Sequence, residues 1–439
     1  MIAMVTSRIP GFYKLTLEER RRIAAEALGV EVEELEHAIG DGGMDAARAD
    51  KCIENVVGTY AMPFAIGLNV QMNGRDYLVP MVVEEPSVVA AASNAAKIIR
   101  HGGGFEAEAD APLMIAQIQL DGVTDAEAAR AAIEAATPEL LALADDSIPG
   151  LVARGGGARA IELRDLGDGW LVAHVLVDCR DAMGANLVNT VAESLSDRVA
   201  ELAGGRAGLR ILSNLSDRRN TRVRCSIPVS QLAFGGYTGE EVRDRIVKAS
   251  EFAERDPYRA ATHNKGTMNG IDPVVIATGN DWRAIEAGAH AYAARNGRYE
   301  PLCTWRRGDD GALVGFMEVP LALGTVGGTL RVHEGARFGL QVAGVDSAQE
   351  LAMLAACAGV ASNLAALRAL ATDGIQRGHM ALHARSVAIA AGARGDHVEQ
   401  VARAIHESGA VTVEAAREVL RALTGRSDGT PPLGVPAET

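Results

Sequence analysis

The spacing of apolar residues along this chain changes several times, and each change predicts a different kind of element. Residues 14–60 show helical spacing, most clearly at 17–28 and 44–57. The segment NVQMNGRDYLVP, residues 69–80, places apolar residues on both sides of Asn73-Gly74. That pair favours a two-residue turn, so the segment is predicted to be a β-hairpin.

A helix is predicted directly after the hairpin, in EEPSVVAAASNAAKIIRHGGG, residues 84–104. Pro86 stands where the first helical residue is expected, because its fixed φ suits the first turn and its missing N–H is not needed there. Gly102 is expected to end the helix. One face carries the apolar residues Val88, Ala92, Ala95 and Ile99.

The pattern changes between residues 109 and 217, where short apolar runs alternate with two amphipathic helices. In chain order it predicts strand, helix, strand, strand, helix and strand. This β-α-β-β-α-β order is typical of the split ferredoxin-like unit and differs from the repeated βαβ of a Rossmann domain. The six predicted elements span residues 112–120, 125–145, 158–166, 169–178, 184–204 and 208–215.

Helical patterns resume beyond residue 218, and residues 1–108 have no obvious core of their own. We therefore expect 1–108 and 218–375 to form one large, mainly helical domain into which 109–217 is inserted. Two further amphipathic stretches lie within 376–439, ahead of a Pro/Gly-rich end that is expected to be disordered. The expected fold class is α+β, with a discontinuous large domain, a ferredoxin-like insert and a helical carboxy-terminal segment.

The net charge and the cysteine spacing exclude several classes of function. The net charge is −14, which argues against nucleic-acid or anionic-membrane binding. No apolar run reaches the ~18 residues of a membrane span, and the amino terminus lacks the pattern of a signal peptide. The five cysteines are scattered without C-x-x-C spacing, which is typical of reduced thiols. A soluble, cytoplasmic protein is expected.

The densest set of chemically useful side chains lies in DPYRAATHNKGTMNGIDPVVIATGNDWRA, residues 256–284. A lysine among glycines can stabilise negative charge that develops on an oxygen, so the segment predicts a polar active-site loop. Ordinary roles compete with this hypothesis. Lys265 could be a solvated loop residue, and Asp281 could cap the following helix in competition with Asn280. The side chains of interest are Arg259, His263, Lys265, Asn269 and Asp281.

Acidic and histidine candidates stand outside that segment. Glu84-Glu85 precede Pro86 and could cap a helix, but a carboxyl group whose pKa is raised there could also donate a proton. His379 and His383 are spaced i, i+4, yet they lack the glutamate of H-E-x-x-H and a third ligand, so no metal site is predicted. A histidine general acid fits better, because its pKa lies near neutrality.

Several glycine-containing turns could approach a phosphate group. Met183-Gly184-Ala185 falls between a predicted strand and a predicted helix, where backbone N–H groups are available. The glycines at 155–157 and in GTVGGTL at 324–330 fit neither a Walker nor a G-x-G-x-x-G pattern. The turns alone therefore identify no ligand.

Taken together, six segments closely resemble the 3-hydroxy-3-methylglutaryl-CoA (HMG-CoA) reductases, and in particular their soluble bacterial class II. The resemblance runs from about residue 6 to about residue 425, in the same order and with few gaps. The segments are ENVVG (54–58), NGRDYLVPMVVEEPSVVAAAS (73–93), RDAMGAN (180–186), LRILSNL (209–215), residues 256–284 and GIQRGHMALHAR (374–385).

This resemblance implies the interconversion of HMG-CoA with mevalonate and coenzyme A, a four-electron reaction through mevaldyl-CoA and mevaldehyde that uses two nicotinamide cofactors in succession. Lys265 would stabilise the oxyanion, and His379 would protonate the sulfur of coenzyme A so that it leaves as a thiol. Glu85 would supply a proton at the aldehyde stage. Asp281 would couple the proton affinities of Lys265 and Glu85.

The resemblance also implies binding residues. Those around the hydroxymethylglutaryl carboxylate and hydroxyl are Ser87, Arg259 and Asn269. Those on the cofactor side are Asp181, Met183, Gly184, Ala185, Asn186 and Asn214. Family members that prefer NADH carry an acidic residue shortly before the triple glycine. Asp145 and Asp146 lie in that region, although an ungapped alignment puts Ile148 at the position itself. NADH with Asp146 as its ribose ligand is expected, and NADPH stays open.

Family members place the site between two subunits and close it with a mobile carboxy-terminal flap. The resemblance therefore implies a homodimer or a larger homo-oligomer, with HMG-CoA, mevalonate and coenzyme A as its ligands. It also implies that 376–439 is the flap, for which Gly378 is a candidate hinge. The direction of the reaction in the cell stays open. The alternative function is a non-redox enzyme acting on a CoA thioester, such as a lyase or hydratase, that uses Glu85 and Lys265.

Overall fold

The computed structural model describes residues 6–40, 42–372 and 384–424, and these form two compact units. The first unit comprises the chain up to Glu84 and from Val88 to Arg368. The second comprises Glu85–Ser87 and the chain from Ala369 onward. The structure is mixed α+β, as predicted, and both of its sheets lie in the first unit.

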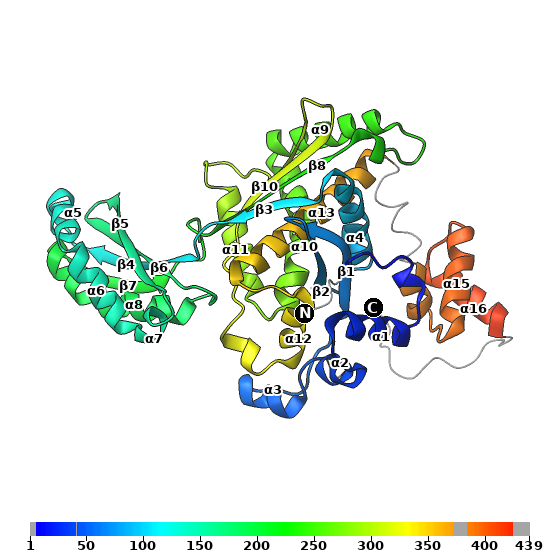
Figure 1. Cartoon of the computed structure of the whole chain (residues 1–439), viewed down its shortest axis with the longest axis horizontal. Coiled ribbons are helices and arrows are strands. Elements are labelled where there is room, and N and C mark those ends of the chain that lie inside the picture. Colours follow the sequence, from blue (N-terminus) through cyan, green and yellow to red (C-terminus); the bar gives the residue numbers. More distant parts are fainter. Residues whose placement is uncertain (1–5, 41, 373–383, 425–439) are drawn as a thin grey trace. The chain divides into compact units, whose positions relative to one another are not determined.

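A six-stranded sheet runs through the first unit (Figure 1). Its strands are β1 (Phe64–Met72), β2 (Arg75–Val82), β3 (Phe105–Ala109), β8 (Asn220–Ile227), β9 (Cys303–Arg307) and β10 (Leu313–Pro320). Their order across the sheet is β2-β1-β3-β8-β10-β9. β1 and β2 form the predicted hairpin around Asn73-Gly74, with Met72 paired to Arg75. β3 pairs antiparallel with β8, so the segments before and after the insert meet in one sheet.

Helices resume beyond residue 218 as predicted, but the sequence pattern did not predict the strand β8. Val223 and Cys225 are buried, whereas Arg224 between them is exposed. This is the period of two of a strand with one covered face. The arginines on the open face hide the apolar alternation when the sequence is scanned for helices. The large unit is therefore built on a sheet as well as on helices.

The second sheet has four strands, each antiparallel to its neighbours, in the order β5-β6-β4-β7. The strands are β4 (Leu113–Asp121), β5 (Gly157–Gly167), β6 (Trp170–Asp178) and β7 (Arg206–Leu212). The helices that accompany them are α5 (Ala126–Ala135), α6 (Thr137–Ser147), α7 (Pro149–Val152) and α8 (Ala185–Ala203). α8 buries Val188, Val191, Leu195 and Val199 in the core of this sheet. The predicted β-α-β-β-α-β order, and with it the ferredoxin-like insert, is confirmed.

The remaining helices of the first unit surround the six-stranded sheet. They are α1 (Leu17–Leu28), α2 (Val32–Ile39), α3 (Ala46–Cys52), α4 (Val88–Ile99), α9 (Gly239–Arg255), α10 (Pro257–Ala277), α11 (Trp282–Ala293), α12 (Glu334–Ala343) and most of α13 (Ala348–Ala371). Short 3₁₀ turns lie at Phe12–Lys14, Arg100–Gly102, Val229–Gln231 and Gly328–Arg331. The helix predicted at 17–28 is confirmed, whereas only Ala46–Cys52 is helical within 44–57.

The segment that was predicted to be a polar loop is the 21-residue helix α10, so that prediction was wrong. Asp256 caps it by accepting hydrogen bonds from the backbone N–H groups of Tyr258 and Arg259. Its glycines serve packing rather than flexibility. A Cβ at Gly270 would lie 2.1 Å from the carbonyl oxygen of Ala358 in α13. The two helices therefore pack backbone to backbone at this point.

The helix after the hairpin begins later than predicted. α4 starts at Val88, and Pro86 lies in the turn before it. Ser87 occupies that turn with a φ of 78°, in the left-handed region that is unfavourable for a residue with a side chain. Such a backbone conformation persists only where the surrounding structure imposes it, and it is common at functional sites.

Two linkers connect the four-stranded sheet to the six-stranded one, and they lie side by side. The backbone N–H of Asp110 donates to the carbonyl of Asn220, and the backbone N–H of Asn220 donates to the Asp110 carboxylate. The same carboxylate pairs with Arg222 at 2.7 Å, and Arg222 pairs with Glu318 at 2.6 Å. The entry and exit of the inserted unit are thus fastened to each other.

From residue 384 onward, the described part of the second unit is mainly helical. Residues 384–390 form one helix, and the next two are α15 (Asp396–Glu407) and α16 (Val413–Thr424). The last two match the predicted amphipathic stretches. Their shared core includes Val387, Val401 and Ile405.

The helix α13 is the one element of the described chain that is long and apolar enough to cross a membrane. However, 78% of its most apolar window is buried inside the protein. Ala355, Cys357 and Leu364 are fully covered by neighbouring elements. α13 is therefore a core helix, and its composition reflects packing.

Candidate active site

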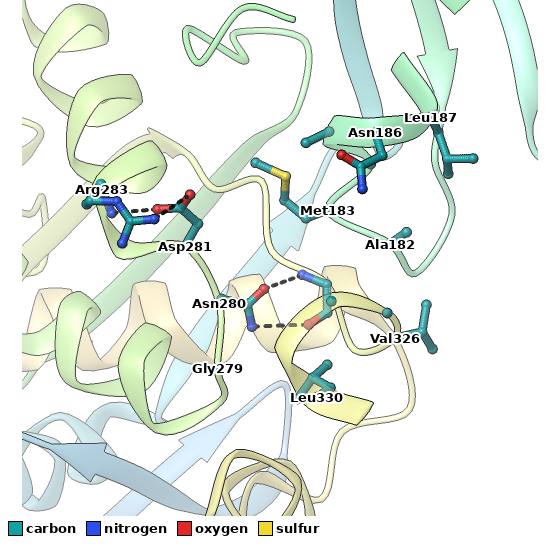
Figure 2. A pocket seen from close by; sticks show the side chains of 15 residues that line it. Ala182, Met183, Asn186, Leu187, Gly279, Asn280, Asp281, Arg283, Val326 and Leu330 are labelled. Atoms are coloured by element: carbon teal, nitrogen blue, oxygen red, sulfur yellow. Dashed lines mark hydrogen bonds and ion pairs between the residues drawn. The ribbon is translucent and has the colours of Figure 1, made fainter. Parts of the chain in front are cut away.

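A pocket of about 430 Å³ in the first unit is built from three turns (Figure 2). They are the turn between β6 and α8, the turn between α10 and α11, and the glycine-rich turn after β10. In Figure 2, Asp281 and Arg283 lie on one side of the pocket, and Asn186 and Leu187 lie on the other. The volume is typical of a small-molecule site.

The turn before α8 offers backbone donors to the pocket. Gly184 is the N-cap residue, with a φ of 98°, and it provides no side chain to cap the helix. The first turn of α8 carries no acidic residue, and Ala185, Asn186 and Leu187 line the pocket. A helix N-terminus with uncapped N–H groups and a positive dipole end favours an anion such as a phosphate group.

The glycine-rich turn is held against the α8 turn. A Cβ at Gly324 would lie 2.6 Å from the backbone nitrogen of Met183, so only glycine allows this approach. The backbone N–H of Thr325 donates to the carbonyl of Asp181 at 2.8 Å. Asn280 holds the turn from its other side. Its Oδ1 accepts from the Gly324 N–H at 2.8 Å, and its Nδ2 donates to the Gly324 carbonyl at 3.1 Å (Figure 2).

Asp281 lines the pocket from the start of α11. Its Oδ1 accepts from the backbone N–H groups of Arg283 and Ala284 at 3.0 and 3.1 Å. Its Oδ2 lies 3.1 Å from the Arg283 guanidinium. The competition with Asn280 for the cap is thereby resolved: Asp281 caps α11, and Asn280 binds the glycine-rich turn.

Helix α10 carries the lysine and the asparagine of the candidate site on one face. Lys265 is exposed, and Asn269 follows it by four residues, so the two side chains are neighbours on the helix surface. Pro273 stands four residues beyond Asn269 and has no N–H. The carbonyl of Asn269 therefore lacks its usual helical donor. This face therefore carries the side chains of Lys265 and Asn269 and a backbone carbonyl that lies outside the regular hydrogen-bond pattern of the helix.

Arg259 lies in the first turn of α10 and is half-buried. Burial lowers the pKa of its guanidinium, because charge is removed from water. Its side chain forms no ion pair or hydrogen bond with any residue that the structure describes. A half-buried arginine in this state is suited to an anionic ligand, which would supply the missing partner.

Two other polar residues of α10 serve the fold. Nε2 of His263 donates to the carbonyl of Cys303 at 2.8 Å, and burial lowers the pKa of this histidine to about 4. Asn264 donates to the carbonyl of Glu300 and accepts from the backbone N–H of Leu302. The prediction counted both side chains as signs of an active-site loop. They instead attach α10 to the segment that leads into β9.

A carboxylate pair links α10 to α11. Burial, followed by a hydrogen bond to Glu286, raises the pKa of Asp272 to about 8, so Asp272 holds the proton of the pair. Glu286 lies 2.6 Å from Nε2 of His290, and this contact lowers the pKa of Glu286 and raises that of His290. Nδ1 of His290 lies 2.6 Å from the hydroxyl of Tyr299. Asp272 is three residues beyond Asn269, on the same face as Lys265.

Glu85 and Ser87 belong to the second unit. Glu85 is partly exposed, whereas the exposed Glu84 precedes it. The Ser87 hydroxyl oxygen is buried and has no hydrogen-bond partner in the described part of the chain. A buried hydroxyl without a described partner, on a left-handed backbone, is typical of a residue that binds a ligand.

Three of the cofactor-side candidates do not line the pocket. The Asp181 carboxylate accepts from the backbone N–H of Ala348 at the start of α13. Asn214 is exposed in the linker after β7. Asp146 is also exposed, and it forms no hydrogen bond or ion pair with the described residues.

The region before the triple glycine has mainly structural contacts. Oδ1 of Asp145 accepts from the backbone N–H of Ala158 at 2.7 Å. Ile148 is buried in the core of the four-stranded sheet. Asp146 therefore presents the available carboxylate of this region.

His379, His383 and Gly378 lie outside the described residues. Within the described ranges, no group of three histidine, cysteine or acidic side chains could hold a metal ion. All five cysteines are unpaired.

The sequence did not single out two residues that shape the pocket. Asn280 was considered only as a cap, and Gly324 only as part of an unspecific glycine run. Their roles follow from contacts between segments that are far apart in the chain. A signal was nevertheless present, since glycine clusters often mark places where two backbones approach closely.

An uncapped helix N-terminus in a pocket of small-molecule size, and a helix that carries lysine, arginine and asparagine, fit an enzyme that acts on an anionic small molecule. A family model of hydroxymethylglutaryl-coenzyme A reductase matches residues 16–384. The chain belongs to this family of oxidoreductases.

Individual relatives agree over nearly the whole chain. The 3-hydroxy-3-methylglutaryl-coenzyme A reductase of Archaeoglobus fulgidus is 47% identical over 422 residues, which cover 95% of each chain. The reductase structure from Streptococcus pneumoniae has a TM-score of 0.80 and 41% identity, and covers 94% of this chain and 99% of that one. A class II structure from the same organism, bound to NADPH in open conformations, has a TM-score of 0.79 and 42% identity, and covers 83% of this chain and 99% of that one.

Proposed function

We propose that this chain interconverts HMG-CoA with mevalonate and coenzyme A, using two nicotinamide dinucleotides in succession. The observation that supports this most strongly is that Met183–Asn186 and Asp281 line one pocket. The family resemblance assigns the first group to the cofactor and Asp281 to the chemistry. A reductase needs these two functions side by side, because the acyl carbon must lie within reach of the nicotinamide.

The residues act on the substrate at three points. When bound, the nicotinamide supplies or accepts the hydride. Lys265 stabilises the negative charge on the acyl oxygen, since an ammonium group near a developing oxyanion lowers the barrier to its formation. His379 donates a proton to the sulfur of coenzyme A as the hemithioacetal breaks down, so that coenzyme A leaves as a thiol. Glu85 donates a proton at the aldehyde stage, and Asp281 influences the proton affinity of both Lys265 and Glu85.

The hydroxymethylglutaryl group is bound, in this proposal, by Arg259, Ser87 and Asn269. Arg259 is half-buried and has no anionic partner among the described residues, so a substrate carboxylate would complete its environment. The buried Ser87 hydroxyl would gain the hydrogen bond that it lacks in the described structure. Asn269 would contact the substrate hydroxyl from the Lys265 face of α10.

The dinucleotide is bound, in this proposal, at the α8 turn. The N–H groups of Ala185 and Asn186 would face its pyrophosphate, because the helix has no cap of its own. Asp181 would act from behind the turn, since its carboxylate caps α13. Asn214 would contact the dinucleotide from the linker.

For the choice of dinucleotide we propose NADH. The exposed Asp146 carboxylate would accept hydrogen bonds from the ribose hydroxyls and repel the 2′-phosphate of NADPH. The NADPH-bound relative from Streptococcus pneumoniae supports a nicotinamide dinucleotide of either kind. Comparing kcat/KM for NADH and NADPH in the enzyme and in Asp146→Ala separates the two.

The wider proposal concerns assembly and domains. We propose a homodimer, or a larger homo-oligomer, located in the cytoplasm. The large domain, 1–108 and 218–375, would bind the acyl-CoA, and 109–217 would bind the dinucleotide. The segment 376–439, which carries His379, would act as a flap. Light scattering coupled to size-exclusion chromatography tests the oligomeric state.

The decisive experiment follows absorbance at the reduced-nicotinamide band with purified protein, mevalonate, coenzyme A and NAD, and then with NADP in its place. Reduction of either dinucleotide that depends on coenzyme A is the expected result. Well-folded protein without this signal in either direction would contradict the proposal and favour the non-redox thioester enzyme.

A further inference from the structure

Arg219 is a buried arginine at the junction of the two sheets, between β7 and β8. Only 4% of its surface is exposed. A buried charge is ordinarily compensated by a carboxylate at contact distance. Arg219 forms no ion pair with any residue in the described ranges. Its guanidinium instead donates to the carbonyl oxygens of Ala182 at 3.2 Å, Met183 at 3.5 Å, and Leu323.

These carbonyls belong to two of the three turns that build the pocket. Ala182 and Met183 follow the four-stranded sheet, whereas Leu323 follows β10 of the six-stranded sheet. The same two turns meet in a parallel bridge between Ala182 and Val326. Arg219 therefore connects both sides of this junction, in addition to the backbone contacts between the two turns.

The charge of Arg219 survives its burial. Desolvation lowers the pKa of its guanidinium to about 10, and the nearby carboxylates of Asp178 and Asp181 oppose that shift. The group is therefore protonated at neutral pH. Its positive charge lies behind the α8 turn, where the positive end of the helix dipole also lies. The two fields add in the pocket of a protein whose net charge is −14.

We propose that Arg219 is a positioning residue for the dinucleotide. By holding the carbonyls of Ala182 and Met183 away from the pocket, it leaves the N–H groups at the start of α8 directed toward the ligand. By remaining charged, it also favours an anionic pyrophosphate in a protein that otherwise repels one. This inference rests on the dinucleotide function proposed above for the same pocket.

The test compares three variants of the full-length enzyme. R219M removes the charge while keeping most of the side-chain volume, and R219K keeps the charge with fewer donors. R218M is the matched control, because Arg218 is the exposed neighbour that pairs with Glu162 and Asp217. Binding of the reduced dinucleotide is measured by fluorescence titration without HMG-CoA, and KM is then measured for each substrate.

R219M is expected to raise the dinucleotide Kd by about 10–100-fold, as for loss of charged hydrogen bonds. The KM for HMG-CoA should stay within about twofold, because the direct substrate residues lie elsewhere. R219K should recover part of the loss, and R218M should match the unmodified enzyme. A purely structural role would instead impair both substrates together and lower the melting temperature in proportion.

Unchanged dinucleotide binding in folded R219M would overturn the proposal, as would an equal loss for both substrates. If R219M does not fold, R219K decides alone, and it must raise the Kd for the dinucleotide but not the KM for HMG-CoA. Failure of the proposed function would appear differently, as the absence of dinucleotide binding and turnover in the unmodified enzyme.

Discussion

The two sides of the proposed site are built by different means. On the side proposed for the dinucleotide, three turns line the pocket, and glycine at position 324 allows two of them to touch. On the side proposed for the substrate, helix α10 carries Arg259, Lys265 and Asn269, none of which lines that pocket. One side is a shape made of main chain, and the other is a set of charges carried on a helix.

This difference determines how each side should fail. A backbone-built site is insensitive to most side-chain changes but is damaged by an added Cβ, because two main chains are forced apart. A site built from side chains is damaged instead by removal of a single charged group, since each charge has its own task.

The largest effect is expected from Lys265→Met. Loss of the ammonium group should lower kcat by roughly 10²–10³-fold, because the oxyanion loses its main electrostatic partner. The Kd of the dinucleotide, measured by fluorescence, should not change. Lys248→Met, which alters an exposed lysine of α9, is the control. Near-normal turnover of Lys265→Met would contradict the proposal that Lys265 stabilises the oxyanion.

A smaller effect, and one on binding, is expected from Arg259→Met. The KM for HMG-CoA should rise about 10–100-fold while kcat falls by less than about threefold, because a charged contact to the substrate is lost in the ground state and transition state alike. Initial rates over a range of HMG-CoA concentrations measure both. Arg255→Met, at the exposed end of α9, should leave them unchanged. An effect confined to the KM for the dinucleotide would mean that Arg259 does not bind HMG-CoA and would contradict the proposal.

The matching change on the backbone side is Gly324→Ala. Its Cβ would meet the Met183 nitrogen at 2.6 Å, so the turns must separate. The KM for the dinucleotide should rise about tenfold, and that for HMG-CoA should stay constant. Gly150→Ala is a suitable control, because the nearest atom to an added Cβ there is the end of Arg154 at 3.8 Å. Equal changes in both KM values would mean that the two sides are not separable.

The smallest effect concerns stability and pH. The pKa of Asp272 in the fold, about 8, lies above its ordinary value, so its contribution to stability is greatest at low pH and is lost as pH rises through 8. Asp272→Asn replaces the protonated acid with a neutral amide. The melting temperature of this variant, relative to the unmodified protein, should therefore rise by about 2–4 °C between pH 5 and pH 8 and then level off.

The control for that experiment is Asp197→Asn, an exposed carboxylate on α8, whose relative melting temperature should not depend on pH. If Asp272→Asn follows the unmodified protein at every pH, the two carboxylates do not share a proton. The carboxylate pair links α10 to α11, so the pH dependence reports on the α10 side.

Sequence patterns predicted those parts of the molecule in which neighbours along the chain decide the structure. Asn73-Gly74 determines the hairpin locally. The insert was recognised because its six strands and helices follow one another directly in the chain. Helix α10 was missed because Gly266, Gly270 and Pro273 lower helix propensity. Close packing of Gly270 against α13 outweighs that preference, and nothing in the segment itself reveals the partner.

The same limit applies to the site. The resemblance named the side chains that would do chemistry, and the structure places Met183–Asn186 and Asp281 around one pocket. Arg219 gave no signal, because an arginine in SDRRN resembles any solvated loop arginine. Only its burial against carbonyls from two distant turns distinguishes it. The role of a residue such as Arg219 depends on tertiary contacts, which the local sequence does not reveal.

The fastened linkers at Asp110 and Asn220 have a consequence for how the chain reaches its fold. β3 and β8 are neighbours in the six-stranded sheet, yet the whole inserted unit separates them in the chain. Closing so long a loop of unfolded chain is entropically costly and slow. An insert that has already folded, with its ends together, removes most of that cost. We therefore expect the four-stranded unit to fold first and to template the pairing of the outer sheet.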